Sequence, residues 1–271
     1  MKTCFLTWQD CQGTRGWHVI GRLAAADGVY EFCYVKGVAA AMEAGFEPIL
    51  SFPSLETTYS SSVLFPFFRN RIPRRKQSLA QLASWTGALN LPDDPLELIL
   101  LGGGVSGTDS YGVVAPLEID ISGRTRVKFF VRGLRYLPGE SNRRARSLER
   151  GEKLAIALEL NNPRAGRGVL VIADDYTVLG WVPRHLVSAM FNVDLSRGEV
   201  LCRVIASNKS PAPPDMCLYV ELDFHLSGKI GDRVPEDCLP LVTGQPLEDC
   251  ARQKTLAWTF SDDLRRTGGR A

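Results

Sequence analysis

Histidine and closely spaced cysteines are scarce in this chain. Its 271 residues include three histidines and seven cysteines, and no two cysteines stand in a Cys-x-x-Cys arrangement. A structural zinc site needs several closely spaced nitrogen or sulfur ligands. The sequence therefore predicts no metal site, and no motif in it indicates a cofactor.

Long apolar runs are also absent. No segment approaches the roughly 18 consecutive apolar residues of a membrane-spanning helix, and residues 1–12 lack a basic start followed by an apolar core. An odd number of cysteines without a secretory signal is typical of reduced thiols. We therefore expect a cytoplasmic protein with no membrane contact.

The groups that enzymes bring together are missing as well. The glycine-rich segment 102–107 is followed by Thr108 and Asp109, whereas a phosphate-binding loop continues with Lys and then Ser or Thr. Asp174 and Asp175 also lie near a suggestive loop, but no histidine accompanies them, so we interpret them as a hairpin turn. The sequence predicts a protein that is not an enzyme.

The net charge is low, but positive charge is concentrated in one segment. The formal net charge is +2, whereas residues 124–167 hold twelve cations against four acids, which is +8 and leaves −6 for the rest of the chain. The cations of this segment are Arg124, Arg126, Lys128, Arg132, Arg135, Arg143, Arg144, Arg146, Arg150, Lys153, Arg164 and Arg167. Such asymmetry favours a polyanionic partner, with scattered surface arginines as the alternative.

The first fifty residues combine strand and helix patterns. Residues 17–23 and 29–35 read as strands on either side of Asp27-Gly28, which is a hairpin signal. Residues 38–44 are rich in alanine and predict a short helix that ends at Gly45.

Residues 50–110 predict a loop followed by helices. Residues 50–62 are rich in Ser, Thr and Pro and predict a loop. In segment 64–76 aromatic residues come first and five cations follow, which indicates a buried aromatic anchor followed by a basic stretch. One helix is expected from a capping box at Ser78 to about Thr86. Another is expected from Asp94-Pro95 to Gly102.

Strand patterns dominate after residue 110. Candidate strands are 111–120, 126–133, 153–160, 168–173, 176–182, 199–206 and 217–225. A helix through about Phe191 is expected with Pro183 at its first position, and a stiff Pro-rich loop at 211–214 separates the last two strands. Five or six short strands with one inserted helix predict a small barrel.

A ladder of short motifs in this strand-rich part resembles the HIRAN domain. In order, the motifs are Gly133-Leu134-Arg135-Tyr136, an apolar strand at 154–160, Asn161-Asn162-Pro163, a strand at 168–172, and Gly180-Trp181-Val182-Pro183-Arg184. The resemblance implies a modified oligonucleotide-binding (OB) barrel that extends over about 122–226. It also implies that this barrel grips single-stranded DNA at a 3′-hydroxyl end.

The resemblance assigns DNA contacts to residues at strand ends. Arg135 and Tyr136 lie in the family's DNA-contact motif, where a guanidinium binds phosphate and a phenol ring stacks on a base. Trp181 is either a stacking platform or a core residue, and Arg184 is a phosphate ligand on the first turn of a helix. His185 is expected on the surface of that helix. The expected DNA-binding residues are Arg135, Tyr136, Arg143, Arg144, Arg146, Asn162, Arg164, Arg167, Trp181 and Arg184.

One turn departs from the family pattern. After Asn162-Pro163 the family continues with an acidic residue and an asparagine that help to hold the terminal nucleotide, whereas this chain has Ala165 and Arg167 at those positions. The cations Arg164 and Arg167 favour phosphate contact without specificity for an end.

Residues 15–76 resemble the small N-terminal subdomain of HipA-type toxin kinases. The matching features are Tyr30-Glu31-Phe32-Cys33-Tyr34, a serine-rich loop, and Phe67-Phe68-Arg69-Asn70-Arg71-Ile72-Pro73. The last segment fits the family's Phe-Phe-x-Asn-Leu-Leu-Pro pattern with Arg71 in place of the first Leu. No kinase catalytic loop follows, so the resemblance implies a partner or regulator of a separate kinase.

Together these patterns predict an α+β protein with two domains and a tail. We expect a helix-and-strand domain at 1–110, a HIRAN-like β-barrel at 111–226, and a partly disordered tail at 227–271. The expected function is non-enzymatic binding of single-stranded DNA or DNA ends through the barrel. The alternative is a regulatory or interaction subunit for a separate HipA-like kinase or toxin in a bacterial defence or toxin–antitoxin system.

Overall fold

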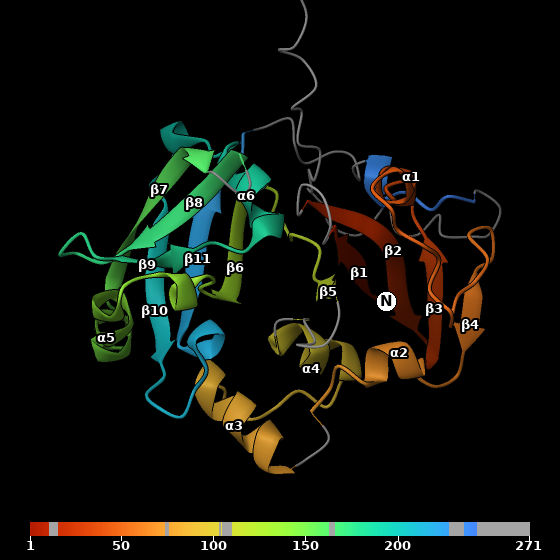
Figure 1. Cartoon of the computed structure of the whole chain (residues 1–271), viewed down its shortest axis with the longest axis horizontal. Coiled ribbons are helices and arrows are strands. Elements are labelled where there is room, and N and C mark those ends of the chain that lie inside the picture. Colours follow the sequence, from red (N-terminus) through yellow and green to blue (C-terminus); the bar gives the residue numbers. More distant parts are fainter. Residues whose placement is uncertain are drawn as a thin grey trace, which may run out of the picture.

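The protein is a mixed α+β molecule with two antiparallel sheets that lie side by side. A computed structural model describes residues 1–10, 16–73, 76–102, 104, 110–162, 166–227 and 236–242. Figure 1 shows the first sheet on the right and the second on the left, with helices α3 and α4 below and between them.

The first sheet is built mainly from the N-terminal part of the chain. Its strand order is β4-β3-β2-β1-β5. The strands are β1 (Lys2–Gln9), β2 (Trp17–Ala26), β3 (Val29–Tyr34), β4 (Tyr59–Ser61) and β5 (Tyr111–Val114). The β2–β3 hairpin is confirmed: Asp27 and Gly28 have φ angles of 52° and 78°, the left-handed values that a tight hairpin turn requires.

Two strands of this sheet were not predicted where they lie. β1 occupies residues that the sequence analysis did not assign to a strand, and β4 falls inside the segment predicted as a loop. β5 pairs with β1 from Phe5↔Val114 to Trp8↔Tyr111. Residues 111–114 therefore belong to the first sheet and not to the second, where the sequence analysis had put them.

Four helices lie between β3 and β5 in the chain and belong to the same part of the protein as the first sheet. They are α1 (Val38–Glu43), α2 (Pro66–Arg69), α3 (Lys76–Thr86) and α4 (Pro95–Leu101). Asp94 caps α4 as expected, because its carboxylate accepts hydrogen bonds from the backbone N–H groups of Leu96 and Glu97 at 2.8 and 3.3 Å. The predicted capping box at Ser78 is wrong: α3 begins two residues earlier, so Ser78 lies inside the helix.

The second sheet contains the remaining strands in the order β6-β11-β10-β7-β8-β9. The strands are β6 (Arg124–Phe130), β7 (Lys153–Asn162), β8 (Gly166–Ile172), β9 (Val178–Trp181), β10 (Leu201–Ser207) and β11 (Leu218–His225). All six match strands that the sequence pattern predicted. Asp174 and Asp175 form the turn between β8 and β9, as expected.

The two outer strands of this sheet are joined by one bridge. Arg132, two residues beyond β6, pairs with Trp181 of β9. The N–H of Arg132 donates to the carbonyl of Trp181 at 2.9 Å, and the N–H of Trp181 donates to the carbonyl of Arg132 at 2.8 Å. The edges of the six-stranded sheet therefore meet at this single residue pair.

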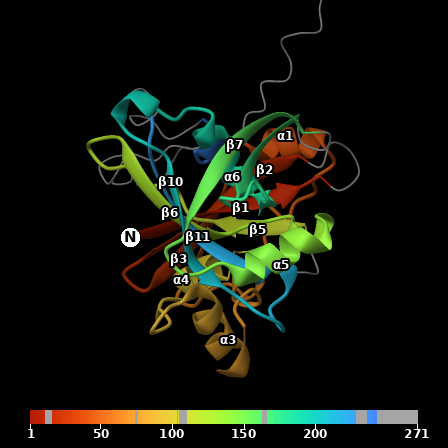
Figure 2. The same cartoon turned by 90° about the vertical axis from the view of Figure 1, so that its left-hand side faces the viewer.

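Short helices complete the second part. They are α5 (Gly139–Ser147), α6 (Arg184–Met190) and the 3-10 turns η1 (Leu134–Tyr136), η2 (Leu195–Arg197) and η3 (Pro214–Met216). A fourth 3-10 turn, η4 (Glu236–Cys238), packs against the first sheet. Figure 2 looks at this side of the molecule, with α5 in the foreground and α3 projecting below. The sequence analysis placed Pro183 at the first position of α6, but the structure places it one residue earlier, at the N-cap.

The hydrophobic core runs across both sheets. Phe5, Val19 and Val35 of the first part belong to the same cluster of buried side chains as the interior of the second sheet. Helix α3 also crosses over, because the side-chain amide of Asn208 donates to the carbonyl of Trp85 at 2.9 Å. A buried cluster therefore joins the two expected domains, while a second cluster, which includes Leu23, Phe32 and Phe68, lies within the first of them.

Part of the predicted tail packs against the first sheet. The N–H of Lys36 donates to the carbonyl of Leu239 at 2.9 Å, and the N–H of Leu241 donates to the carbonyl of Tyr34 at 3.0 Å. Cys238 is buried and belongs to the cluster of side chains that joins the two sheets. Residues 236–242 are thus part of the fold, while residues 228–235 and 243–271 lie outside the described residues.

Candidate nucleic-acid interface

Trp181 is held in a slot at the end of β9. A Cβ atom on Gly133 would lie 2.6 Å from the six-membered ring of Trp181, and one on Gly168 would lie 3.3 Å from the five-membered ring, so glycine is needed at the first position. The indole N–H donates to Glu159 Oε2 at 2.8 Å, and the side-chain amide of Asn162 donates to the same oxygen at 2.8 Å. The ring is fixed but remains partly exposed.

Arg135 and Tyr136 lie on η1, directly after the glycine that contacts Trp181. Gly133 has a left-handed φ of 79°, which turns the chain out of the sheet and starts η1. The guanidinium of Arg135 lies 5.6 Å from the ring centre of Tyr136 and forms an ion pair with Asp215. Tyr136 is 64% exposed, so its ring can receive a base.

Two of the three predicted arginines on α5 have structural partners. Arg144 forms ion pairs with Asp174, Asp175 and Glu152 at 2.6, 2.8 and 3.4 Å. These side-chain hydrogen bonds, with Asp174 the largest contributor, raise the pKa of Arg144. Arg144 therefore ties α5 to the β8–β9 turn, and its predicted contact with DNA stays a prediction.

Arg146 is also used inside the protein. Its Nε donates to Asn142 Oδ1 at 2.7 Å, and its two terminal nitrogens donate to the carbonyls of Asn208 and Ala212 at 2.8 and 2.9 Å. It anchors the β10–β11 loop, and its predicted contact with DNA stays a prediction. Arg143, by contrast, is exposed.

The β8 and α6 cations flank Trp181 on the other side. Arg167 is exposed, and its guanidinium lies 5.1 Å from the ring centre of Phe191. Arg184 donates from Nη1 to the backbone carbonyl of Arg167, which holds α6 against the end of β8. Arg164 was also predicted to bind DNA but lies outside the described residues.

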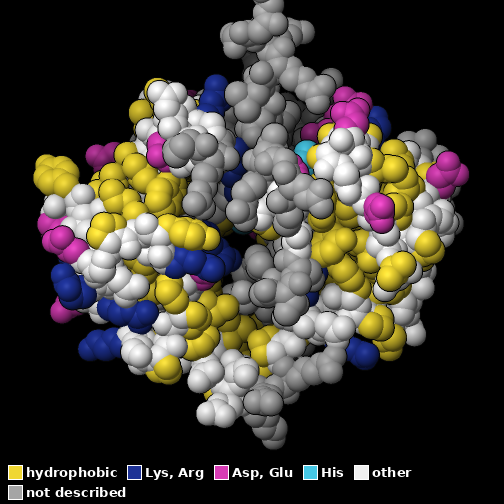
Figure 3. All heavy atoms as spheres, in the orientation of Figure 1, with side chains coloured by type: hydrophobic (Ala, Val, Ile, Leu, Met, Phe, Trp, Pro, Cys, Tyr) yellow, Lys and Arg dark blue, Asp and Glu magenta, His cyan; other side chains and the backbone are white. Residues whose placement is uncertain are grey.

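The positive charge of segment 124–167 is partly neutralised by acids from elsewhere in the chain. Asp223 of β11 accepts from Arg124 at 2.7 and 2.8 Å and from Arg126 at 2.9 Å, and Glu221 lies 3.7 Å from Lys128. The hydrogen bonds from Arg124 and then Arg126 lower the pKa of the Asp223 carboxyl. Figure 3 accordingly shows cations over this half in separate places, with acids among them.

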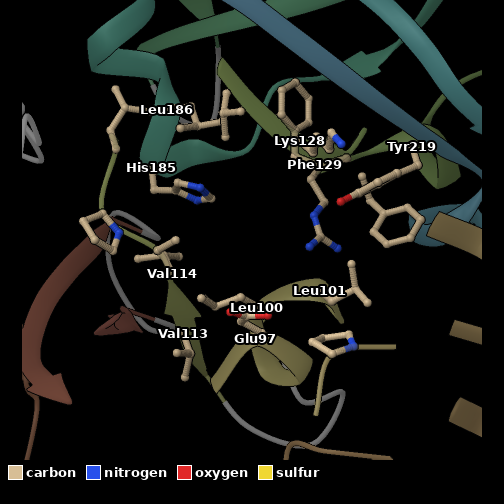
Figure 4. Close-up of a pocket in the computed structure, with 17 residues that line it drawn as sticks. Glu97, Leu100, Leu101, Val113, Val114, Lys128, Phe129, His185, Leu186 and Tyr219 are labelled. Atoms are coloured by element: carbon tan, nitrogen blue, oxygen red, sulfur yellow. The ribbon is translucent and has the colours of Figure 1, made fainter. Parts of the chain in front are cut away.

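A cavity of ≈ 320 Å³ lies between the two sheets. Arg132 and Lys128 of the second sheet line it together with His185 of α6, opposite Leu100 and Leu101 of α4. The expectation that His185 sits on the surface of its helix is wrong, because it faces this cavity (Figure 4). No local sequence pattern indicates the cavity, because its walls come from segments far apart in the chain.

Ionisable groups in the cavity are strongly perturbed. Burial, together with the positive charge of Arg132, lowers the pKa of the His185 imidazole to about 3. Burial, followed by the charge of Arg135, lowers the pKa of the Arg132 guanidinium from its usual value. His185 is therefore a neutral hydrogen-bonding group at physiological pH.

Comparison with known proteins does not assign this chain to a family. Neither the protein-family models nor the curated proteins match it. Within the described ranges, no group of His, Cys, Asp or Glu side chains is arranged to hold a metal ion. In the same ranges no helix is long and apolar enough to cross a membrane.

Proposed function

We propose that the protein binds single-stranded DNA without catalysing a reaction. The observation that carries the proposal is the fixed, partly exposed Trp181 ring with the exposed Tyr136 ring near it, since Gly133 adjoins both. Stacking of bases on aromatic rings is tolerant of sequence, and neighbouring cations supply phosphate contacts. Arg135, Arg143, Arg167 and Arg184 are the cations that flank these rings.

The second sheet acts in this proposal as an OB-like barrel of the HIRAN type. The pair of hydrogen bonds between Arg132 and Trp181, at 2.9 and 2.8 Å, supports it by joining the two outer strands. The glycine contacts on both sides of Trp181 support it too, because they fall in the motifs that resemble the family. The first part of the chain is the HipA-like unit in this proposal.

Binding is expected to lack specificity for a 3′ end. Glu159 occupies the neighbourhood of Asn162 and Trp181 and already accepts a hydrogen bond from each. Its negative charge opposes a phosphate at that point, so the strand passes on the Tyr136 and Arg167 sides of the indole. A surface of this kind follows the backbone and reads no terminal group.

Fluorescence anisotropy with a single strand carrying a 3′-hydroxyl, the same strand with a 3′-phosphate, and blunt duplex tests the proposal. We expect similar affinity for the two single strands and a steep loss with salt, with a slope of about −0.7 per phosphate contact. Tyr136→Ala should lose about 1–3 kcal/mol of binding if a base stacks there. Tyr176→Ala is the matched control, because Tyr176 is an 88% exposed tyrosine on the β8–β9 turn.

Other outcomes would redirect the assignment. Preference for the free 3′-hydroxyl would mean that an end pocket exists despite Ala165. Unchanged affinity of Tyr136→Ala would remove the stacking site. Absence of binding at low salt would reject DNA as the partner and favour the regulatory-subunit alternative, for which a pull-down with a HipA-like kinase is the measurement.

A further inference from the structure

The cavity between the sheets has an unusual combination of walls. Apolar side chains from several elements line it, including Leu100 of α4, Val114 of β5, Phe129 of β6 and Leu186 of α6. Figure 4 shows His185 and Leu186 on one side, Lys128 and Tyr219 across from them, and α4 with Glu97, Leu100 and Leu101 below. A volume of ≈ 320 Å³ falls within the range of small-molecule sites, which begins at about 300 Å³.

Arg132 is the group in the cavity that points to a ligand. It is partly buried, and among the residues that the structure describes no ion pair or hydrogen bond engages its guanidinium. Burial and then the like charge of Arg135 lower the pKa of Arg132, and neither provides a partner for its charge. Its nitrogens are not sealed from solvent, but a guanidinium in a largely apolar cavity has less water around it than one on the surface, and arginines in such places are normally paired.

The other arginines of this half show how the chain satisfies them when their role is structural. Arg124 is paired with Asp223, Arg144 has three carboxylates, and Arg146 has two carbonyls and an amide oxygen. Arg132 differs from all of them because its side chain faces an open, largely apolar cavity. No described residue pairs with its guanidinium, and an anion bound in the cavity would supply a partner.

The neighbouring groups fit an anionic partner. The neutral imidazole of His185 lies close enough to Arg132 for the arginine charge to affect it, and neutral imidazole can donate one hydrogen bond. Two cavity residues have charged partners elsewhere: Lys128 lies 3.7 Å from Glu221, and Glu97 pairs with Lys2. Arg132 is thus the anchor for a negative group, with His185 beside it.

We propose that this cavity binds a small organic anion. Its anionic head, a carboxylate or a phosphate monoester, contacts Arg132 and His185, and its apolar body packs against Leu100, Leu101 and Phe129. Such a ligand touches both sheets, because α4 and β5 belong to the first part and β6 and α6 to the second. The cavity lining includes neither Tyr136 nor Trp181, so this proposal does not depend on DNA binding.

Binding of four probes to the full chain tests this site. Phenyl phosphate and benzoate carry both parts of the ligand, inorganic phosphate carries the head alone, and benzyl alcohol carries the apolar part without charge. Affinities are measured by ligand-detected NMR titration, and thermal melting reports stabilisation. We expect phenyl phosphate, benzoate or both to bind at least tenfold more tightly than inorganic phosphate and benzyl alcohol. Binding of one anion alone identifies which head the site takes.

Two variants and a control connect the binding to the cavity. Arg132→Met should weaken the anion at least tenfold while the protein stays folded, since it removes an unpaired charge and keeps the side-chain bulk. Leu100→Trp keeps Arg132 but fills the cavity, and should also weaken the anion at least tenfold. Arg203→Met, at an exposed position of β10, is the matched control and should bind as the wild type does.

Three results would overturn the proposal. One is failure of both phenyl phosphate and benzoate to bind, and another is equal affinity for benzyl alcohol. The third is anion binding that survives in Arg132→Met or in Leu100→Trp. The outcome of the DNA titrations changes none of these readings, because Tyr136 and Arg132 are probed by different variants and different ligands.

Discussion

Two adjacent arginines of α5 lie in opposite environments. Arg143 is exposed, whereas the Arg144 side chain is only 20% exposed and touches three carboxylates. Sequence alone treats the two as equivalent cations on one helix. Their difference arises because the β8–β9 turn brings Asp174 and Asp175 to one face of α5 and leaves the other face to solvent.

This difference gives opposite expectations for the two alanine variants. Arg144→Ala should lower the free energy of unfolding by about 1–2 kcal/mol, because it leaves a cluster of carboxylates without its cation, and it should change DNA affinity little. Arg143→Ala should leave stability within about 0.5 kcal/mol and weaken DNA binding. Urea unfolding and anisotropy on both variants test the pair. If Arg144→Ala weakened DNA binding and Arg143→Ala did not, Arg144 and not Arg143 would be the phosphate contact.

At the scale of elements, the bridge between Arg132 and Trp181 depends on the residue before the tryptophan. Gly180 has a φ of 141°, and a Cβ there would lie 2.3 Å from the carbonyl oxygen of Arg132. We expect Gly180→Ala to push β9 away from the end of β6 and to lower the free energy of unfolding by about 2 kcal/mol or more.

The matched control for this substitution is Gly139→Ala. Gly139 begins α5, and a Cβ there has no atom within 4 Å, so alanine should be neutral or slightly stabilising. Urea unfolding of the two variants gives the comparison. Equal stability of Gly180→Ala and the wild type would show that the bridge contributes nothing to holding the sheet edges together.

The elements that were predicted correctly carry local signals. The β2–β3 hairpin has Asp27-Gly28 at its turn, and α4 has its Asp94 cap, so each could be recognised within a few residues. β1 has no such mark, and β5 reads as a strand without showing which sheet it joins. Pairing of β1 with β5 joins residues about a hundred positions apart, and no local pattern specifies it.

The candidate interface was predictable only in part for the same reason. Gly133 and Trp181 lie in motifs named from the sequence, but the packing of the Trp181 ring against Gly133 and Gly168 was not predicted. Tyr136 is exposed, as a stacking residue has to be. The partners of Arg124, Arg144 and Arg146 come from acids and carbonyls tens of residues away. Whether an arginine is free or neutralised is therefore a property of the fold, and the +8 segment overstated the usable charge.

At the scale of the whole molecule, the shared core predicts that both sheets unfold together. Cys4 lies in the first sheet, Cys202 in the second, and Cys238 in the returning segment; all three are buried, and burial raises the pKa of each thiol to about 12. Buried, protonated thiols react slowly. Each cysteine therefore reports the opening of its own part of the fold.

We expect these three cysteines to become reactive toward iodoacetamide at the same urea concentration, as mapped by peptide mass spectrometry at pH 8. The reason is that Phe5, Val19 and Val35 are buried against the second sheet, so neither part can open without exposing the other. Cys33, which is partly exposed, should react at lower urea. Labelling of Cys4 well before Cys202 would show two independently unfolding domains.

The first sheet pairs strands that are far apart in the chain, and this affects when the sheet can form on the ribosome. Its first strand waits for β5, and at about 5–20 residues per second roughly five to twenty seconds pass before that partner is made. The end of β3 waits longer still, until the segment around Leu239 and Leu241 emerges. The part of the protein that is translated first is therefore among the last to be completed, and its apolar strands stay within reach of chaperones while the rest is made.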